Sequence, residues 1–184
     1  MSKLVHGIGV YRTGKYQSSD PSYKLWVSMI GRCTPGSIAQ KKNTSYIGCS
    51  VHPDWIEFQT FAEWCHYQVG FDCEDYQLDK DILVTGNKVY GSATCRFVPS
   101  KINRLLTNNK RNKGLYPTGV SLDASGKYRA QIGIANRVKY IGVFASVDEA
   151  SIAYECAKRT EIRSMANKYK YEIDGLVYAA LMSL

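Results

Sequence analysis

The sequence has no long apolar run. Nowhere in its 184 residues do about 18 apolar residues follow one another, which is the length that a membrane-spanning helix needs. Residues 1–7 also lack the apolar core of a signal peptide. Apolar residues make up 45% of the chain and charged residues 22%, as in ordinary globular proteins. These features exclude a membrane span and disorder as the main state, and they predict a protein that is not secreted.

The six cysteines form no CxxC pair, which argues against a zinc ribbon. Without a secretion signal we also expect no disulfides. Four of the cysteines could in principle converge on one zinc ion, but the gaps between them are long and irregular and disfavour a structural zinc. We expect the cysteines to act as small buried hydrophobic residues. The four zinc candidates are Cys33, Cys49, Cys73 and Cys95.

Acidic residues are scarce in the second half of the chain. Residues 1–100 carry 10 Lys and Arg against 9 Asp and Glu, whereas residues 101–184 carry 14 against 7. The formal net charge of +8 therefore belongs almost entirely to the second half. Within 101–140, nine basic residues accompany a single acid, Asp123. Such a basic block is typical of nucleic-acid binding. A soluble protein that merely has a high isoelectric point is the alternative.

Hydrophobic spacing predicts two helices in the first half, over residues 23–32 and 54–67. The second of these has an aromatic face behind an acidic N-cap, and its role is to build the core. The segments around them lack helical spacing. We expect an extended arm over residues 1–22, a loop over 34–46 and a short strand over 46–51.

The middle of the chain predicts the order strand, loop, strand, helix. Residues 77–81 lead into a turn at 85–88, and residues 89–99 form the second strand. Ser100 then caps a helix that carries three apolar side chains. The polar, charged run over residues 107–113 has no apolar anchor and predicts an interdomain linker.

The last part of the chain predicts a three-stranded meander followed by a helix. Residues 119–122, 128–134 and 139–144 alternate with turns, as strands do. Ser146 and Glu149 form a capping box for a helix over residues 147–168. A stripe of small residues lets this helix lie close to the sheet. Residues 171–184 predict a short closing helix.

The C-terminal unit resembles the AP2 DNA-binding domain over residues 119–159. The resemblance implies that the sheet, and not the helix, enters the major groove of DNA, whose width suits a sheet face. It rests on Gly119-Val120, Lys127-Tyr128-Arg129-Ala130, Tyr140-Ile141-Gly142-Val143-Phe144, Glu149-Ala150 and Ala153-Tyr154.

Strand alternation then selects the face that meets DNA. Along the second strand, a polar set alternates with an apolar set, and we expect the polar set to face DNA. Arg129 and Gln131 carry the donors for bidentate contacts to guanine and adenine. We expect phosphate contacts from the remaining cations, including those of the linker; a solvated sheet face is the alternative. These cations are Lys127, Arg137 and Lys139 of the sheet and Lys110, Arg111 and Lys113 of the linker.

The first half resembles the HNH-type homing endonucleases of bacteriophages, in the subgroup that carries a C-terminal AP2 domain. With the AP2 part, the resemblance covers nearly the whole chain. It implies a strand–strand–helix cradle for one divalent metal, which acts on the scissile phosphate while a base activates water. It rests on Trp26-x-x-Met29-Ile30-x-Arg32-Cys33, Gly48-Cys49-x-Val51-x-x-x-Trp55-x-x-Phe58-x-x-Phe61-x-x-Trp64, Leu78-Asp79-Lys80-Asp81, Asn87-Lys88-x-Tyr90 and Thr94-Cys95-x-Phe97-Val98-Pro99-x-x-Ile102-Asn103.

The resemblance assigns roles to five residues of the cradle. Asp79 matches the acid that binds the metal, and Asn103 matches the amide ligand on the opposite wall. Asn87 matches the central asparagine that fixes the loop between the strands, and Asp81 and Lys80 complete the catalytic set. Oxygen ligands of this kind suit Mg²⁺ or Mn²⁺. A solvated turn at Asp79 and Asp81, and a plain helix surface at Asn103, are the alternatives.

Lys80 departs from the family pattern, because the residue after the metal-binding acid is usually the histidine that acts as general base. An ordinary lysine is a poor base at neutral pH. Lys80 could instead stabilise charge that develops on the phosphate. His52 or His66 could supply the base from elsewhere, or the cradle could be inactive.

Taken together, the sequence predicts an α+β protein with a ββα-metal (HNH-like) nuclease module and flanking helices, followed by an AP2-like three-stranded antiparallel sheet on one helix. The expected divisions are an arm over 1–22, a nuclease domain over 23–106, a basic linker over 107–113 and a DNA-binding domain over 114–184.

The expected function is site-specific, metal-dependent cleavage of double-stranded DNA, as in homing endonucleases. A catalytically inactive DNA-binding protein with a regulatory role is the alternative, and an RNA target or a partner protein would account for the charge as well. We expect a monomer that makes no membrane contact and works in the cytoplasm of an infected bacterial host.

Overall fold

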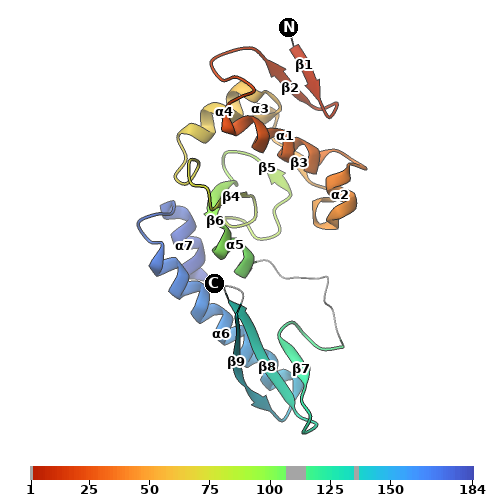
Figure 1. The fold of residues 1–184 in the computed structure, drawn as a ribbon, viewed down its shortest axis with the longest axis vertical. Coiled ribbons are helices and arrows are strands. Elements are labelled where there is room, and N and C mark those ends of the chain that lie inside the picture. Colours follow the sequence, from red (N-terminus) through yellow and green to blue (C-terminus); the bar gives the residue numbers. More distant parts are fainter. Residues whose placement is uncertain (1, 107–114, 135–136) are drawn as a thin grey trace. The chain divides into compact units, whose positions relative to one another are not determined.

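The computed structural model describes residues 2–106, 115–134 and 137–184. It is an α+β protein with small sheets, and it forms two compact units (Figure 1). None of the helices among these residues is long and apolar enough to cross a membrane. The division after Val98 falls earlier than the predicted linker over 107–113, all of which lies outside the described residues. The first unit is Met1–Val98 with Glu172–Val177, and the second is Pro99–Tyr171 with Tyr178–Leu184.

Three two-stranded sheets and several helices make up the first unit. Strands β1 and β2 pair antiparallel, β3 and β5 pair parallel, and β4 pairs with β6. The elements are β1 (Ser2–Val5), β2 (Gly9–Arg12), α1 (Pro21–Cys33), α2 (Ile38–Lys42), the 3-10 helix η1 (Thr44–Tyr46), β3 (Ser50–Val51), α3 (Pro53–Ile56), α4 (Phe58–His66), β4 (Tyr76–Asp79), β5 (Val89–Tyr90) and β6 (Arg96–Pro99).

The core of the first unit is largely aromatic. Helix α1, predicted from its spacing, is confirmed, and it starts at Pro21 because Asp20 caps its first turn. Trp26 of α1 is fully buried, and its ring nitrogen donates to the Trp55 carbonyl at 2.8 Å. The bond satisfies the indole donor inside an apolar core. Other buried members of this core are Met29, Ile30, Phe58, Phe61, Cys65, Leu78, Tyr90, Cys95 and Phe97.

The first residues form a hairpin instead of the predicted extended arm. Strands β1 and β2 turn at His6 and Gly7, both of which have positive φ angles. Gly9 packs so closely on Trp26 that a Cβ there would lie 2.7 Å from the ring. The segment has too few apolar side chains for its sequence to predict a strand. Packing against Trp26 therefore forms the hairpin, which the local sequence does not indicate.

The helix predicted over residues 54–67 is broken at Glu57. The backbone of Glu57 is extended and forms a parallel bridge with Val10 of β2, and its carboxylate pairs with Arg12 at 3.7 Å. Pairing with a distant strand therefore interrupts a segment whose spacing is helical throughout. The amphipathic aromatic face itself is confirmed in α4.

The loop predicted over residues 34–46 contains two short helices, α2 and η1. The Ser37 and Asn43 side chains accept backbone hydrogen bonds at their first turns. Gln40 holds the segment in place, because its amide donates to the carbonyls of Arg32 at 3.1 Å and Tyr46 at 3.3 Å. Capping by polar side chains thus gives structure to a run without apolar periodicity.

The predicted strand over residues 89–99 is two strands, β5 and β6. Between them the amides of Thr94 and Cys95 both donate to the Gly91 carbonyl, and the Thr94 hydroxyl donates to the Val89 carbonyl. This tight turn sends β5 to β3 and β6 to β4. The predicted order of strand, loop, strand and helix is otherwise confirmed.

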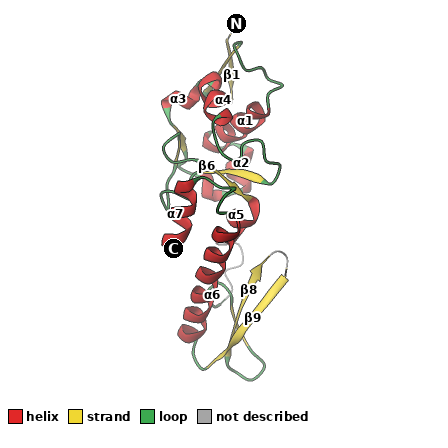
Figure 2. Cartoon of the chain, turned by 90° about the vertical axis from the view of Figure 1, so that its left-hand side faces the viewer, coloured by secondary structure: helices red, strands yellow, loops and turns green. Residues whose placement is uncertain are grey.

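The second unit is a three-stranded antiparallel sheet with a long helix packed on it, and Figure 2 shows this helix beside strands β8 and β9. Its strand order is β7-β8-β9, and all three strands and the helix were predicted. Ser146 caps α6, and Glu149 reaches back to the Ala145 amide at 3.1 Å. The elements are α5 (Ser100–Leu106), β7 (Val120–Leu122), β8 (Tyr128–Ile134), β9 (Arg137–Phe144), α6 (Val147–Lys168) and α7 (Gly175–Ser183).

A β-bulge interrupts the pairing of β8 with β9. Ala130 pairs with Gly142, but the next residue, Gln131, pairs with Tyr140, so Ile141 is the extra residue. Simple alternation would place Arg137 and Lys139 on the same face as Val143. Because of the extra residue, they lie on the opposite face of the sheet.

Candidate metal and nucleic-acid sites

Asp79 ends strand β4 and is held by the loop that follows. Its Oδ1 accepts hydrogen bonds from the amides of Asp81 at 2.7 Å and Ile82 at 2.8 Å. Among the described residues no group donates to Oδ2. Burial raises the pKa of the Asp79 carboxyl despite these two amide bonds. The loop thus fixes one oxygen of a half-buried carboxylate and leaves the other for a ligand.

Lys80 is buried, with 7% of its surface exposed. Its ammonium donates to the Asp81 carboxylate and to the Asn87 carbonyl, the latter at 2.7 Å. An ammonium that donates in this way has no lone pair to accept a proton. The geometry therefore gives Lys80 a structural cation's role in the loop and does not favour it as the general base.

Asn87 closes the loop from the other side. Its amide nitrogen donates to the Lys80 carbonyl at 2.8 Å and to the Val89 carbonyl at 2.7 Å, and its amide oxygen accepts from the Val89 amide at 3.1 Å. These three hydrogen bonds of the Asn87 side chain hold the loop to β5. It positions the loop, and its amide oxygen already accepts one hydrogen bond.

The four cradle residues of the first unit are therefore together in one loop. Asn103 lies in α5, which is grouped with the second unit, and the pairing of Asp79 with Asn103 stays a prediction. No three His, Cys, Asp or Glu side chains among the described residues are placed to hold a metal ion. A Mg²⁺ site needs only one or two protein oxygens and water, and Oδ2 of Asp79 fits that requirement.

The two histidine candidates have different surroundings. His52 lies directly after β3, where its amide donates to the Tyr90 carbonyl of β5 at 2.8 Å. His66 lies at the end of α4, where its ring contacts the Asp20 carboxylate at 2.9 Å and stacks on Tyr16. His52 is thus bound to the strand that follows the Asn87 loop, whereas His66 joins α4 to the start of α1.

The cysteines are free thiols, and four of them are buried. Burial raises the pKa of Cys33 and of Cys95 to about 12. Thiols of this kind remain protonated at neutral pH and react slowly. The four buried cysteines act as small core residues, as predicted, whereas Cys73 and Cys156 are exposed, which corrects the prediction for these two.

The open face of the second sheet can be assigned from the register. Ala130 and Ile132 are buried toward α6. The residues that alternate with them in β8, and the residues of β7 and β9 paired with that alternate set, therefore lie on the opposite face of the sheet. That face carries one cation, one amide and several exposed apolar or aromatic side chains. Its members are Ser121, Arg129, Gln131, Gly133, Val138, Tyr140 and Val143.

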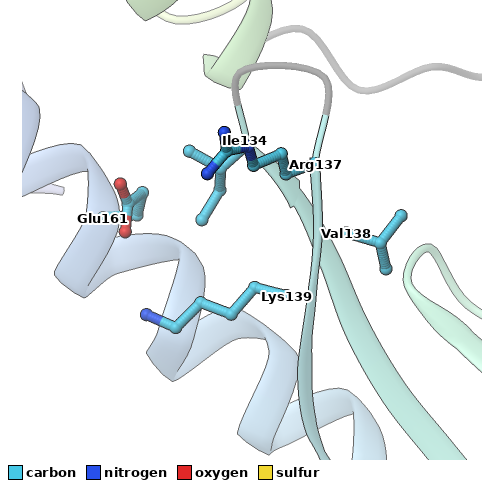
Figure 3. A pocket seen from close by; sticks show the side chains of 5 residues that line it. All are labelled: Ile134, Arg137, Val138, Lys139 and Glu161. Carbon is cyan, nitrogen blue, oxygen red and sulfur yellow. The ribbon is translucent and has the colours of Figure 1, made fainter.

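Arg137 and Lys139 do not extend this face, which corrects the sequence prediction. They pair with Ile134 and Ile132, so their side chains lie on the side of α6, across from Glu161, while Val138 points away (Figure 3). Together with Glu161 they line a hollow of about 680 Å³. The bulge at Ile141 causes the reversal, because one extra residue inverts the alternation.

On the open face, Asp123 fixes the position of the Arg129 guanidinium. Their side chains form an ion pair. The pKa of the Asp123 carboxyl is lowered first by a hydrogen bond from the Ser125 amide and then by the bond from Arg129. The Arg129 Nε is buried and has no hydrogen-bond partner among the described residues. Lys127 is exposed in the turn before β8.

Sequence reasoning missed the apolar part of the open face. Tyr140 is 62% exposed and Val138 is 69% exposed, although both are paired with β8 within strand β9. Their position could have been found only from the register of β9 against β8. The linker cations Lys110, Arg111 and Lys113 lie outside the described residues.

Comparisons of the chain with models of protein families, with curated proteins and with solved structures returned no match.

Proposed function

We propose that this chain is a metal-dependent, site-specific DNA endonuclease of the homing type. In this proposal an HNH-like first unit cuts the phosphodiester bond and the AP2-like sheet of the second unit reads the target. The charge distribution supports the division, because the cation excess lies in the second half, where strong attraction to DNA is needed.

The observation that carries the proposal is the loop between Asp79 and Asn87. One carboxylate oxygen of Asp79 is fixed by two amides, and the other accepts no hydrogen bond from any described residue. The Lys80–Asn87 bonds hold the loop closed. A site that must place a metal within a fraction of an ångström needs such support. The chain order of β4, the loop, β5, β6 and α5 supports the proposal, because the family resemblance implies a strand–strand–helix cradle.

Asp79 is the residue that would hold a divalent ion, with Asn103 as the second ligand that the family resemblance implies. A bound Mg²⁺ would stabilise charge on the scissile phosphate and its leaving oxygen. Lys80 keeps the loop closed around Asp79. Asp81 balances the charge of Lys80, which would otherwise be costly to bury.

The open face of the sheet is proposed to read DNA. Arg129 and Gln131 offer donors to base edges, while Tyr140 and Val143 offer apolar contact of the kind that suits a thymine methyl group. A face with few charges leaves most phosphate binding to other cations of the chain.

Plasmid nicking tests the proposal. Purified protein is incubated with supercoiled DNA that carries the cognate site, with Mg²⁺ and with EDTA, and Asp79→Ala is compared with Asp75→Ala, an exposed acid outside the loop. We expect nicking by the wild type and by Asp75→Ala in Mg²⁺ alone, and none by Asp79→Ala. Cleavage that survives Asp79→Ala would disprove the site assignment.

The second candidate function is a DNA-binding protein without nuclease activity. Its specific support is Lys80, whose ammonium stands where the family has its basic histidine and is bound within the loop. DNA binding combined with a reproducible lack of Mg²⁺-dependent nicking would favour this candidate.

A further inference from the structure

Three exposed lysines of the first unit lie on segments bound to the Asp79 loop. Lys41 and Lys42 form the last turn of α2, and Lys88 precedes β5. The sequence around α2 has no acid at all, because residues 21–53 contain two further cations and neither Asp nor Glu. We call Lys41, Lys42 and Lys88 the lysine surface.

The segment that carries Lys41 and Lys42 is held rigidly. The Gln40 side-chain amide donates to the carbonyls of Arg32, before α2, and Tyr46, after it. The Gln40 amide oxygen accepts from the Gly36 backbone amide at 3.2 Å. The Arg32 guanidinium lies 5.2 Å from the centre of the Tyr46 ring. These contacts join α1, α2 and η1, so the two lysines are presented by a fixed element and not by a free loop.

Lys88 connects this segment to the Asp79 loop. Its ammonium donates to the Ser45 carbonyl at 2.7 Å, and its own carbonyl accepts from the Ser50 amide at 2.9 Å. The residue before it is Asn87, which binds Lys80. The chain between Lys42 and Ser45 spans at most about 11 Å. The lysine surface therefore lies beside the candidate metal site.

The chemistry of this surface suits a chain of phosphates. Each ammonium has three donors, so Lys88 keeps donors free beyond its bond to Ser45. Lysine binds phosphate as a point charge, without the geometric demands of arginine. DNA presents one phosphate for about every 3.4 Å of each strand, so cations this close together can contact successive phosphates.

We propose that the lysine surface binds the sugar–phosphate backbone of double-stranded DNA next to the bond that would be cleaved at the Asp79 site. This inference rests on the proposed endonuclease function and adds a binding surface in the near-neutral first half of the chain. The surface positions the scissile phosphate, whereas the sheet of the second unit reads the sequence.

The test is the salt dependence of DNA affinity for the full chain. Binding of a mixed-sequence duplex is measured across a salt series for the wild type and for Lys41→Gln/Lys42→Gln. Each lost phosphate contact lowers the slope of log K against log salt by about 0.9 and weakens binding about eightfold at 0.1 M salt. We therefore expect the double variant to lose about two units of slope, with nicking reduced through a higher KM.

Two controls separate charge from structure. Lys24→Gln removes an exposed lysine from the opposite end of α1, and it should leave the slope unchanged. Lys41→Arg/Lys42→Arg keeps both charges, and it should restore most of the affinity. An unchanged slope in the glutamine variant, or an equal loss in Lys24→Gln, would overturn the inference.

The outcome is separable from that of the proposed function. If the wild type nicks DNA and the glutamine variant binds and nicks normally, the lysine surface is wrong and the endonuclease stands. If the wild type never nicks DNA but the slope falls as expected, the surface binds DNA and the nuclease function is wrong.

Discussion

Lys80 and Asn87 hold each other across the loop that follows β4. The Lys80 ammonium donates to the Asn87 carbonyl at 2.7 Å, and the Asn87 amide donates to the Lys80 carbonyl at 2.8 Å. This reciprocal pair fixes the ends of an eight-residue loop and keeps Asp79 at its entrance. The candidate metal site therefore depends on two residues that need not touch the metal.

Removing either member of this pair should destabilise the protein. Asn87→Ala deletes three hydrogen bonds and leaves the buried Lys80 carbonyl without its donor, which costs about 1–3 kcal/mol of unfolding free energy. Urea denaturation measures the loss. Thr85→Ala, at an exposed position of the same loop, is the matched control and should cost less. Equal losses would show that Asn87 does not hold the loop.

Asp79→Asn should separate cleavage from binding. Losing the charged ligand should lower Mg²⁺-dependent nicking at least about a hundredfold, because a metal on developing charge contributes several kcal/mol. DNA affinity in EDTA should not fall. A gel-shift titration and a nicking assay on the same preparation give both values, and a parallel loss of affinity would speak against a metal ligand.

The same variant predicts a pH effect on stability. Burial raises the pKa of Asp79, so the folded protein holds this proton more tightly than the unfolded chain. The unfolding free energy of the wild type should therefore fall as pH rises from the ordinary aspartate range through the raised value. Asp79→Asn should be more stable than the wild type at pH 7, and the two should converge at low pH. Thermal melting across this range provides the measurement.

Arg129 and Lys139 should respond differently to substitution. Arg129→Ala alters the open face and should change sequence preference, with about 1–3 kcal/mol lost on the best site. Lys139→Gln lies on the α6 side and should leave the preference unchanged. Selection from a randomised duplex library measures both. A changed preference in Lys139→Gln would mean that the face toward α6 takes part in reading bases.

Asp20 and His66 form a pair whose strength depends on pH. Burial opposes the charge of Asp20, but hydrogen bonds from Ser22 and contact with His66 outweigh it and lower the pKa of this carboxyl. A lowered pKa adds stability above the ordinary aspartate range, and this stability is lost as pH falls through the lowered value. Asp20→Asn, which still caps α1, should cost about 1 kcal/mol at pH 6, and this cost should disappear once the pH falls below the lowered pKa of Asp20. Thermal melting of the wild type and of Asp20→Asn, at pH 6 and through the acidic range, measures this difference in stability.

Local sequence patterns predicted much of the fold because helices and strands repeat over a few residues. The spacing of Trp26, Met29 and Ile30 determined α1, and the capping box of Ser146 and Glu149 determined where α6 starts. The residue types of the candidate site were also readable from the sequence, since Asp79, Lys80, Asp81 and Asn87 follow one another within a single loop.

Tertiary contacts decided what these patterns do not encode. Glu57 leaves its helix because Val10, 47 residues earlier, pairs with it, and Arg137 and Lys139 change faces because Ile141 bulges against β8. Alternation along a strand depends only on neighbours in the chain, whereas a bulge depends on the partner strand. By itself the sequence determined the types of elements and the chemical groups available. Which face each group occupies, and the burial of Lys80 as a cation paired within its loop, were decided only when distant segments packed together.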